Sequence, residues 1–230
     1  MAAPKKTTTV AKKASELKIP PLKMQQVVFH IEGDVPYVQH KFSQKKRAQM
    51  RAKHEQGSMQ AGKRTAKPPR DFNQDFIDAT HFIDQKGGCG IPAAAFRAAM
   101  VSACRLVGFK MTIAKMALFI VQDGFDVDDS TALVRIDGNP EASADQPHYT
   151  EHTTRNETGV ADIRARPMWD PGWTAKVRVE FDADQFKEAD VKALMERAGR
   201  QVGVGEGRPD SKKSVGMGWG TFRVVSTKAA

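Results

Sequence analysis

Glycine is concentrated near the C-terminus of this chain. Seven of its 18 glycines lie between Gly199 and Gly220, in a run that separates a helix-like segment from a final strand-like one. Glycine adopts positive φ without strain and lets another molecule approach the backbone closely. Two arginines, two lysines and Trp219 are interspersed among these glycines. We therefore expect a loop outside the packed core that contacts a phosphate backbone carrying bases.

The chemistry of such a loop suits phosphate. Its backbone N–H groups form anion-binding nests, and basic side chains add charge-assisted hydrogen bonds to phosphate oxygens. An ordinary surface hairpin is the alternative, and Trp219 either stacks on a base or packs beneath the loop. Gly207 is followed by Arg-Pro, so a nucleoside triphosphate loop is not expected. The candidate binding residues here are Gly205, Gly207, Arg208, Lys212, Lys213, Gly216, Gly218 and Trp219.

Basic residues are concentrated in the first part of the chain. Residues 1–70 contain 16 Lys or Arg and 4 Asp or Glu, a net charge of +12, and the remainder carries a net charge of −3. Such a cluster is typical of a surface that binds nucleic acid or another polyanion, although a solvated tail that aids solubility is the alternative. The stretch around residues 42–55 fits a basic helix. Its candidate nucleic-acid-binding residues are Lys45, Lys46, Arg47 and Arg51.

The sequence disfavours several classes of protein. No apolar run reaches the length of a membrane span and the N-terminus lacks a signal-peptide core, so we expect a soluble, cytoplasmic protein. Cys89 and Cys104 match neither a zinc-ligand spacing nor a disulfide framework. His148 and His152 have the spacing of an inverted zincin motif, but Pro147 favours an extended segment in which the rings do not converge on one ion. We expect no metal, no cofactor and no catalytic residue.

Hydrophobic periodicity predicts alternating strands and helices. The cleanest strand spans residues 174–181, where Ala175, Val177, Val179 and Phe181 alternate with charged side chains. Further strands are expected at about residues 27–31, 79–83, 118–121, 132–136 and 222–225. One helix is expected from Pro92 to Val107, closed by Gly108, and a second through residues 191–198, stopped by Gly199.

The order of these elements predicts the fold. Without the polar insertions it reads strand, helix, strand, strand, helix, strand, which is the α+β, ferredoxin-like (split βαβ) order that RNA-recognition modules also use. Both helices are then expected on one face of the sheet. We expect a disordered basic arm at residues 1–21 and one domain at 22–230, with insertions at 40–78 and 138–172. The second insertion has a hairpin turn near residues 155–159.

Three local patterns occur in an order that resembles the RAMP superfamily of CRISPR-associated proteins, and most of all its guide-RNA backbone subunit. The first is a strand that turns into a short hydrophobic loop, at residues 29–36. The second is Ile91-Pro92 followed by small residues and a helix with arginine, at residues 91–105. The third is the glycine-rich loop before the last strand, at residues 203–222.

The resemblance implies a mechanical function. Such subunits grip the sugar-phosphate backbone of guide RNA in a cleft between the core sheet and the glycine-rich loop, and Arg97 lies in the matching helix pattern. By position, residues 40–78 line the groove and residues 138–172 form a thumb-like insertion that reaches the next copy. Copies of the chain are then expected to assemble head to tail, as a helical oligomer within an antiviral complex that contains other subunits.

Arg164 and Arg166 are candidate phosphate contacts on this thumb. In an extended segment, residues two apart share one face, so both guanidinium groups can reach one strand of nucleic acid. Pairing with the nearby acids Glu157, Asp162 and Asp170 is the alternative for these two arginines.

Two other functions stay open at the level of the sequence. The first is a phage or plasmid protein that coats single-stranded DNA or RNA without a CRISPR system. The second is a RAMP ribonuclease that cuts RNA with one aspartate in a loop after the first strand. The candidates for that aspartate are Asp34, Asp71, Asp75 and Asp78.

Overall fold

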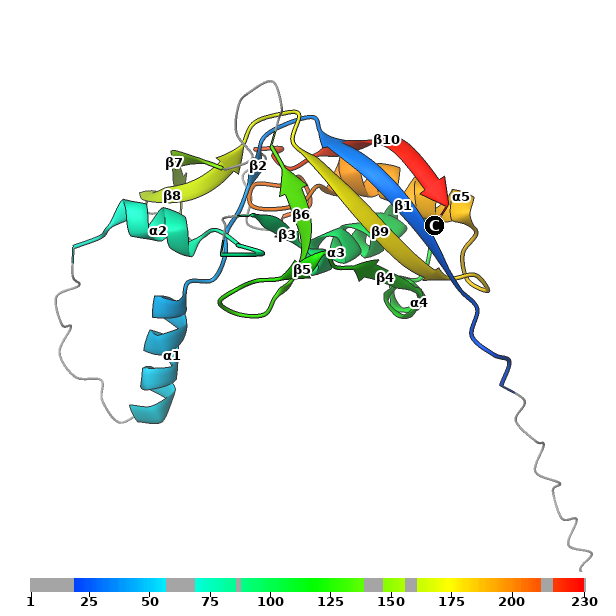
Figure 1. Cartoon of the computed structure of the whole chain (residues 1–230), viewed down its shortest axis with the longest axis horizontal. Coiled ribbons are helices and arrows are strands. Elements are labelled where there is room, and N and C mark those ends of the chain that lie inside the picture. Colours follow the sequence, from blue (N-terminus) through cyan, green and yellow to red (C-terminus); the bar gives the residue numbers. More distant parts are fainter. Residues whose placement is uncertain are drawn as a thin grey trace, which may run out of the picture.

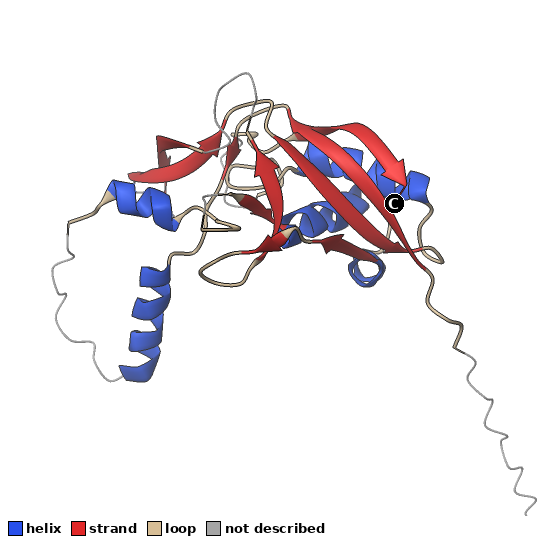
Figure 2. Cartoon of the chain, in the orientation of Figure 1, coloured by secondary structure: helices blue, strands red, loops and turns tan. Residues whose placement is uncertain are grey.

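The computed structural model describes residues 19–56, 69–85, 88–138, 147–155, 161–211 and 217–229 (Figure 1). Nearly all of the predicted basic arm lies outside these ranges, as do Lys212, Lys213 and Gly216 of the glycine-rich run. The described part is a mixed α+β structure with antiparallel sheets (Figure 2). Within it, no helix has the length and apolar character that a membrane span requires.

The main sheet is centred on β1 (Met24–Gly33). This strand lies between β10 (Phe222–Ala229) and β9 (Thr174–Asp182) and is antiparallel to both. The C-terminal half of β9 also pairs with β4 (Leu118–Val121), and its first residues pair with β6 (Ala132–Asp137). The predicted strands at 27–31, 118–121, 132–136, 174–181 and 222–225 are therefore confirmed.

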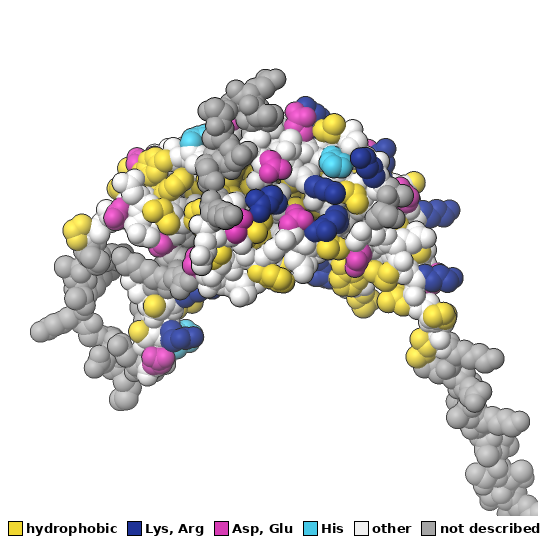
Figure 3. All heavy atoms as spheres, in the orientation of Figure 1, with side chains coloured by type: hydrophobic (Ala, Val, Ile, Leu, Met, Phe, Trp, Pro, Cys, Tyr) yellow, Lys and Arg dark blue, Asp and Glu magenta, His cyan; other side chains and the backbone are white. Residues whose placement is uncertain are grey.

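Alternation along these strands separates a core face from a polar face. The four predicted inward residues of β9, from Ala175 to Phe181, are buried, whereas Lys176 between them is exposed. Val27, Phe29 and Ile31 of β1 join the same core. On the opposite face, Lys and Arg side chains gather over the main sheet with Asp and Glu between them (Figure 3).

Two helices pack against the core face of the sheet. α3 (Ala93–Ala103) continues into a 3₁₀ turn, η1 (Cys104–Val107), and Gly108 closes it at φ +69°, as the sequence predicts. The helix begins one residue later than expected, because Pro92 takes the capping position. α5 (Glu188–Arg197) follows β9. The core residues of the two helices include Phe96, Met100, Val191, Leu194 and Met195.

The predicted stop of the second helix at Gly199 is wrong. The chain continues into a π-helical turn, η2 (Ala198–Val202), and first takes a positive φ at Gly203. Gly199 is needed for packing, because a Cβ there would lie 2.2 Å from the carbonyl oxygen of Phe222. Val202 and Val204 are buried. The first half of the glycine-rich run is therefore part of the core, and the expectation of a loop outside it is wrong for these residues.

The predicted strand at residues 79–83 is also wrong. α2 (Phe72–Asp78) occupies the preceding residues, and the Asp71 carboxylate caps it by accepting hydrogen bonds from the N–H groups of Asn73 and Gln74. Ala79 closes the helix, and after it only Phe82 makes a bridge, to Cys89. Regular pairing starts instead at β3 (Gly90–Pro92), which lies against β6, and β5 (Gly124–Phe125) pairs with another part of β6.

The described part of the first insertion contains two helices, of which the sequence predicted one. α1 (Gln44–Gln56) confirms the basic helix predicted around residues 42–55. α1 projects from the body (Figure 1), and each of its side chains that the structure describes is exposed. α2 occupies the end of the insertion, where the sequence did not predict a helix.

The second insertion folds into a hairpin that is joined to the core. β7 (His148–Arg155) and β8 (Ala161–Trp169) are antiparallel, which confirms the predicted hairpin, and β8 also pairs with β2 (Tyr37–Val38). Trp169 packs on the Tyr37 ring at a centroid distance of 5.4 Å. β7 is a strand, as the sequence predicts for the His148–His152 segment. α4 (Met111–Ala117) precedes β4.

Candidate nucleic-acid interface

A cavity of about 490 Å³ lies between α3 and the glycine-rich loop. Its walls are formed by α3, by Met111 and Lys115 of α4, and by residues 202–205 of the loop. This cavity is lined by three residues that separate sequence patterns predicted as binding candidates, namely Arg97, Gly205 and Arg208. Lys115, which the sequence did not single out, lines it as well. With Asp210 as the one acid of the lining, the wall has a net charge of +2.

Small side chains keep this cavity open. The outer face of α3 presents Ala94, Ala95 and Ala98, each of which is exposed or half-buried. A methyl group projects little from a helix, so another chain could lie close to the helix backbone. Alanine also has the highest helix propensity, which lets α3 hold its shape without long side chains on this face.

Arg97 is held at the rim of the cavity. Its Nε donates a hydrogen bond to the carbonyl oxygen of Leu118 at 2.8 Å, and another guanidinium nitrogen donates to the carbonyl of Lys115. The guanidinium carbon lies 5.4 Å from the centroid of the Phe119 ring. An arginine ordered in this way loses little further side-chain entropy when it binds phosphate.

The loop side of the cavity carries a basic and an acidic group. Arg208 Nη1 donates to the carbonyl oxygen of Gly205 at 3.0 Å. Asp210 accepts from Ser102 and from Arg105, the latter at 2.6 Å. The hydrogen bond from Ser102 lowers the pKa of Asp210; burial opposes this and Arg105 adds to it. Asp210 is therefore ionised at neutral pH and fastens the loop to α3.

The glycines of the loop serve different purposes. Gly205 and Gly207 have φ of +82° and +77°, and a Cβ would meet the Val38 carbonyl oxygen at 2.5 Å and the Trp219 ring at 2.7 Å. These two glycines therefore allow close packing within the chain itself. Gly218 has φ +71° with no atom within 4 Å of a Cβ. Among the candidate glycines in the described loop, Gly218 alone has open space beside it.

Trp219 packs within the loop. Its ring is half-buried, lies against Gly207, and meets the His152 ring edge-on at a centroid distance of 5.2 Å. This is the packing alternative that the sequence left open, and it joins the glycine-rich loop to β7.

Arg164 and Arg166 share one face of β8, and both pair with Glu206 of the glycine-rich loop. The distances are 2.8 Å from Arg164 Nη1 and 2.7 Å from Arg166 Nε. Of the acids expected from the sequence, Asp162 lies 3.5 Å from Arg164, whereas Asp170 pairs with His148 and Glu157 is outside the described residues. Glu206 was missed because it is about forty residues away in the chain.

The basic helix α1 is fixed to the body at its first turn. Arg47 pairs with Asp129 at 2.5 Å. Arg51 is exposed further along the helix, and the side chains of Lys45 and Lys46 lie outside what the structure describes. Neither Arg47 nor Arg51 lines the cavity at α3. The structure therefore does not bring these two α1 candidates together with Arg97 and Arg208.

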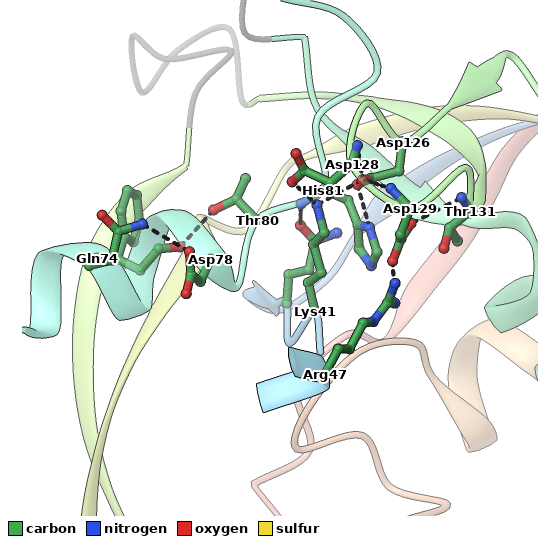
Figure 4. Close-up of polar contacts among 12 residues, drawn as sticks. Lys41, Arg47, Gln74, Asp78, Thr80, His81, Asp126, Asp128, Asp129 and Thr131 are labelled. Atoms are coloured by element: carbon green, nitrogen blue, oxygen red, sulfur yellow. Dashed lines mark hydrogen bonds and ion pairs between the residues drawn. The ribbon is translucent and has the colours of Figure 1, made fainter. Parts of the chain in front are cut away.

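A buried ion-pair network supports the attachment of α1 (Figure 4). Lys41 Nζ lies 2.7 Å from Asp126 and 2.5 Å from Asp128, and His81 Nδ1 lies 2.7 Å from the other oxygen of Asp126. His81, Asp126 and Asp129 place possible ligand atoms within 4.8 Å of one another. The Lys41 ammonium and the Arg47 guanidinium already neutralise these carboxylates, so the arrangement is that of a structural ion-pair network.

The four candidate nuclease aspartates each have a structural partner. Asp34 pairs with Arg223 at 2.5 Å, and Asp75 pairs with Arg70 at 2.5 Å. Asp71 caps α2, and Asp78 accepts a hydrogen bond from the Gln74 side chain at 2.9 Å. Each of these aspartates therefore has a contact that contributes to the fold.

No protein-family model matches the chain, and no curated protein matches it. The functional argument therefore rests on the geometry described above.

Proposed function

We propose that the protein binds single-stranded nucleic acid along the cavity between α3 and the glycine-rich loop. The observation that carries this proposal is the convergence of Arg97, Lys115 and Arg208 on one cavity, in which alanines of α3 and glycines of the loop line part of the remaining wall. Cations at the rim suit phosphates, and the small residues admit a sugar-phosphate chain. The Phe119 ring beneath Arg97 offers a stacking surface for an unpaired base.

The sheet order supports the finer part of the proposal, a ferredoxin-like core. Among the strands β1, β4, β9 and β10, the first and third are central and the second and fourth are at the edges. This antiparallel order is that of a split βαβ unit, with α3 and α5 as its two helices. Together with the resemblance of residues 91–105 and 203–222, it favours a RAMP-type backbone subunit on guide RNA over a coat protein outside a CRISPR system.

Assembly into a head-to-tail oligomer is part of the same proposal. Exposed apolar side chains lie on α2 and the hairpin, at Ile77, Tyr149 and Ile163, and separately at Met116 and Phe119 of α4 and β4. These groups are apart from each other in Figure 1. Two different surfaces that meet between copies form a heterologous contact, which generates rings or helical filaments.

Binding is expected to depend strongly on salt, because phosphate contacts release counterions. If about five phosphates are contacted by each protomer, the slope of log K against log salt is about −3 to −4 for a single strand. Fluorescence anisotropy on single-stranded RNA, single-stranded DNA and duplex, each titrated with KCl, measures this slope and the preference. A slope near zero for every nucleic acid would contradict the proposal.

Removing the cavity cations tests the location of the site. Arg97→Gln and Arg208→Gln are each expected to weaken binding about tenfold and to make the salt slope shallower by about 0.7. Arg178→Gln is the matched control, because Arg178 also donates to a backbone carbonyl, that of Gln122 at 2.7 Å, but is outside the cavity. Equal losses for all three variants would place the site elsewhere.

A further inference from the structure

Glu206 is surrounded by basic side chains from three other parts of the chain. The carboxylate accepts hydrogen bonds from Arg164 and Arg166 of β8 at 2.8 and 2.7 Å. His40 Nδ1 and His152 Nε2 each lie 3.9 Å from one of its oxygens. One carboxylate thus faces two guanidinium groups and two imidazoles.

The cluster is largely shielded from water. The exposed fractions of the side chains are 6% for Arg166, 10% for His152 and 16% for Glu206. Burial by itself raises the pKa of Glu206, but the facing His152 and Arg166 outweigh it and hold the pKa well below its usual range. Neither ring nitrogen of His152 has a hydrogen-bond partner among the described residues, although both are buried. A buried, unsatisfied imidazole beside two arginines indicates that a larger anion fits here.

A phosphodiester is such an anion. It carries the same charge as a carboxylate and presents two terminal oxygens to the arginines, and its tetrahedral phosphorus lets further oxygens reach the imidazoles. Arginine forks match phosphate geometry, and these forks are already ordered and desolvated by the fold. Exchanging Glu206 for phosphate therefore leaves both guanidinium groups paired and returns a carboxylate to water.

We propose that Arg164, Arg166, His40 and His152 form a phosphodiester site that Glu206 occupies in the unbound protein and leaves when nucleic acid binds. This rests on the proposed function and adds to it a second contact, across the loop from the cavity at α3. The exchange requires only a rotation of the Glu206 side chain, because its backbone N–H stays bonded to the Val38 carbonyl at 2.9 Å. Arg164 and His40, which are 27% and 39% exposed, open the site to solvent.

Glu206→Gln tests the exchange, because the amide keeps the shape of the side chain and removes the competing charge. We expect a fluorescein-labelled poly(U) oligonucleotide to bind this variant at least fivefold more tightly than the unmodified protein. The salt slope should steepen by up to about 0.7, which corresponds to one further phosphate contact. Glu180→Gln is the control, since Glu180 accepts a hydrogen bond from Gln26 on the main sheet. Adding Arg166→Gln to Glu206→Gln should cancel the gain.

A thermal readout separates exchange from a merely structural ion pair. Glu206→Gln should melt below the unmodified protein when free, and the oligonucleotide should raise its melting temperature more than that of the unmodified protein. If Glu206→Gln does not fold, Glu206→Asp replaces it in the binding experiment, because the shorter side chain withdraws the carboxylate from the arginines. We then expect the oligonucleotide to bind the variant at least twofold more tightly than the unmodified protein. Equal or weaker binding by the variant overturns the exchange while the proposed function stands. If no form of the protein binds, the proposed function fails as well.

Discussion

Gly220→Ala is expected to lower the melting temperature by roughly 10 °C, whereas Gly218→Ala lowers it by only about 2–4 °C. Both glycines have nearly the same positive φ, +70° for Gly220 and +71° for Gly218. An alanine Cβ at positive φ costs about 1 kcal/mol at either position. The two positions differ in their surroundings, and the comparison therefore isolates packing from backbone strain.

The surroundings of Gly220 leave no room for a side chain. A Cβ there would lie 1.7 Å from the Val204 carbonyl oxygen, and the same two residues are joined by a hydrogen bond from the Val204 N–H to the Gly220 carbonyl at 2.9 Å. Overpacking of this kind costs a further 1–3 kcal/mol or so. Differential scanning calorimetry on both variants checks the difference. Similar shifts for both would mean that the two arms of the glycine-rich loop are not packed together as described.

These glycines illustrate what the sequence could not predict. The run from Gly199 to Gly220 was correctly located before the last strand. Glycine spacing alone, however, cannot distinguish glycines that make room for a ligand from glycines that make room for other residues of the same protein. The difference depends on Tyr37 and Val38, which pack against Gly205 from a distant part of the sequence, and on Phe222, which packs against Gly199 at the other end of the run. Contacts at long sequence separation leave no periodic signal in the loop itself.

Elements with a regular apolar period were predicted well. β9 alternates cleanly, and α3 carries its core residues on one face between Pro92 and Gly108. The strand predicted at 79–83 failed because the Asp71 cap and the helix that follows it take up the preceding residues and Ala79. A local capping contact outweighed a short apolar run of ambiguous period.

The candidate site was predicted in its parts and not in its arrangement. Arg97 and Arg208 were nominated from separate patterns, and only the tertiary structure brings them to one cavity. Glu206 was overlooked, although a lone acid between Gly205 and Gly207 in a loop otherwise rich in basic residues was a usable signal. An acid at that place repels phosphate unless it is paired with basic side chains from other parts of the chain.

Asp126→Asn is expected to destabilise the fold by about 3–5 kcal/mol, because it leaves a buried ammonium without its buried counter-charge. The side chains of Lys41 and Asp126 are 2% and 0% exposed, and Nζ lies 2.7 Å from the carboxylate. Asp128→Asn is the matched control. Asp128 contacts the same ammonium at 2.5 Å but is 46% exposed, so its loss should cost at most about 1 kcal/mol, as for other solvent-exposed pairs.

The same pair gives the fold a defined acid sensitivity. Burial by itself raises the pKa of Asp126, but the hydrogen bonds from Lys41, the Asp128 N–H and His81 together outweigh it, so the pKa lies below its ordinary value. The unfolded chain therefore binds the proton more readily than the folded one. The stabilisation is complete above the unfolded pKa of about 4 and is lost as the pH falls through the lower folded value. His81, whose pKa burial lowers, adds a loss of stability that begins at higher pH.

Urea denaturation at pH 7 and at intervals down to pH 3 measures both effects. The unmodified protein should lose stability steeply below pH 4, whereas Asp126→Asn should be weaker at pH 7 and show a shallower decline, since its amide does not titrate. Asp128→Asn should follow the unmodified protein closely. If the two variants have the same urea midpoint at pH 7, Asp128 and solvent are enough to stabilise the Lys41 ammonium. Asp126 then does not hold α1 and the loop at residues 126–129 together.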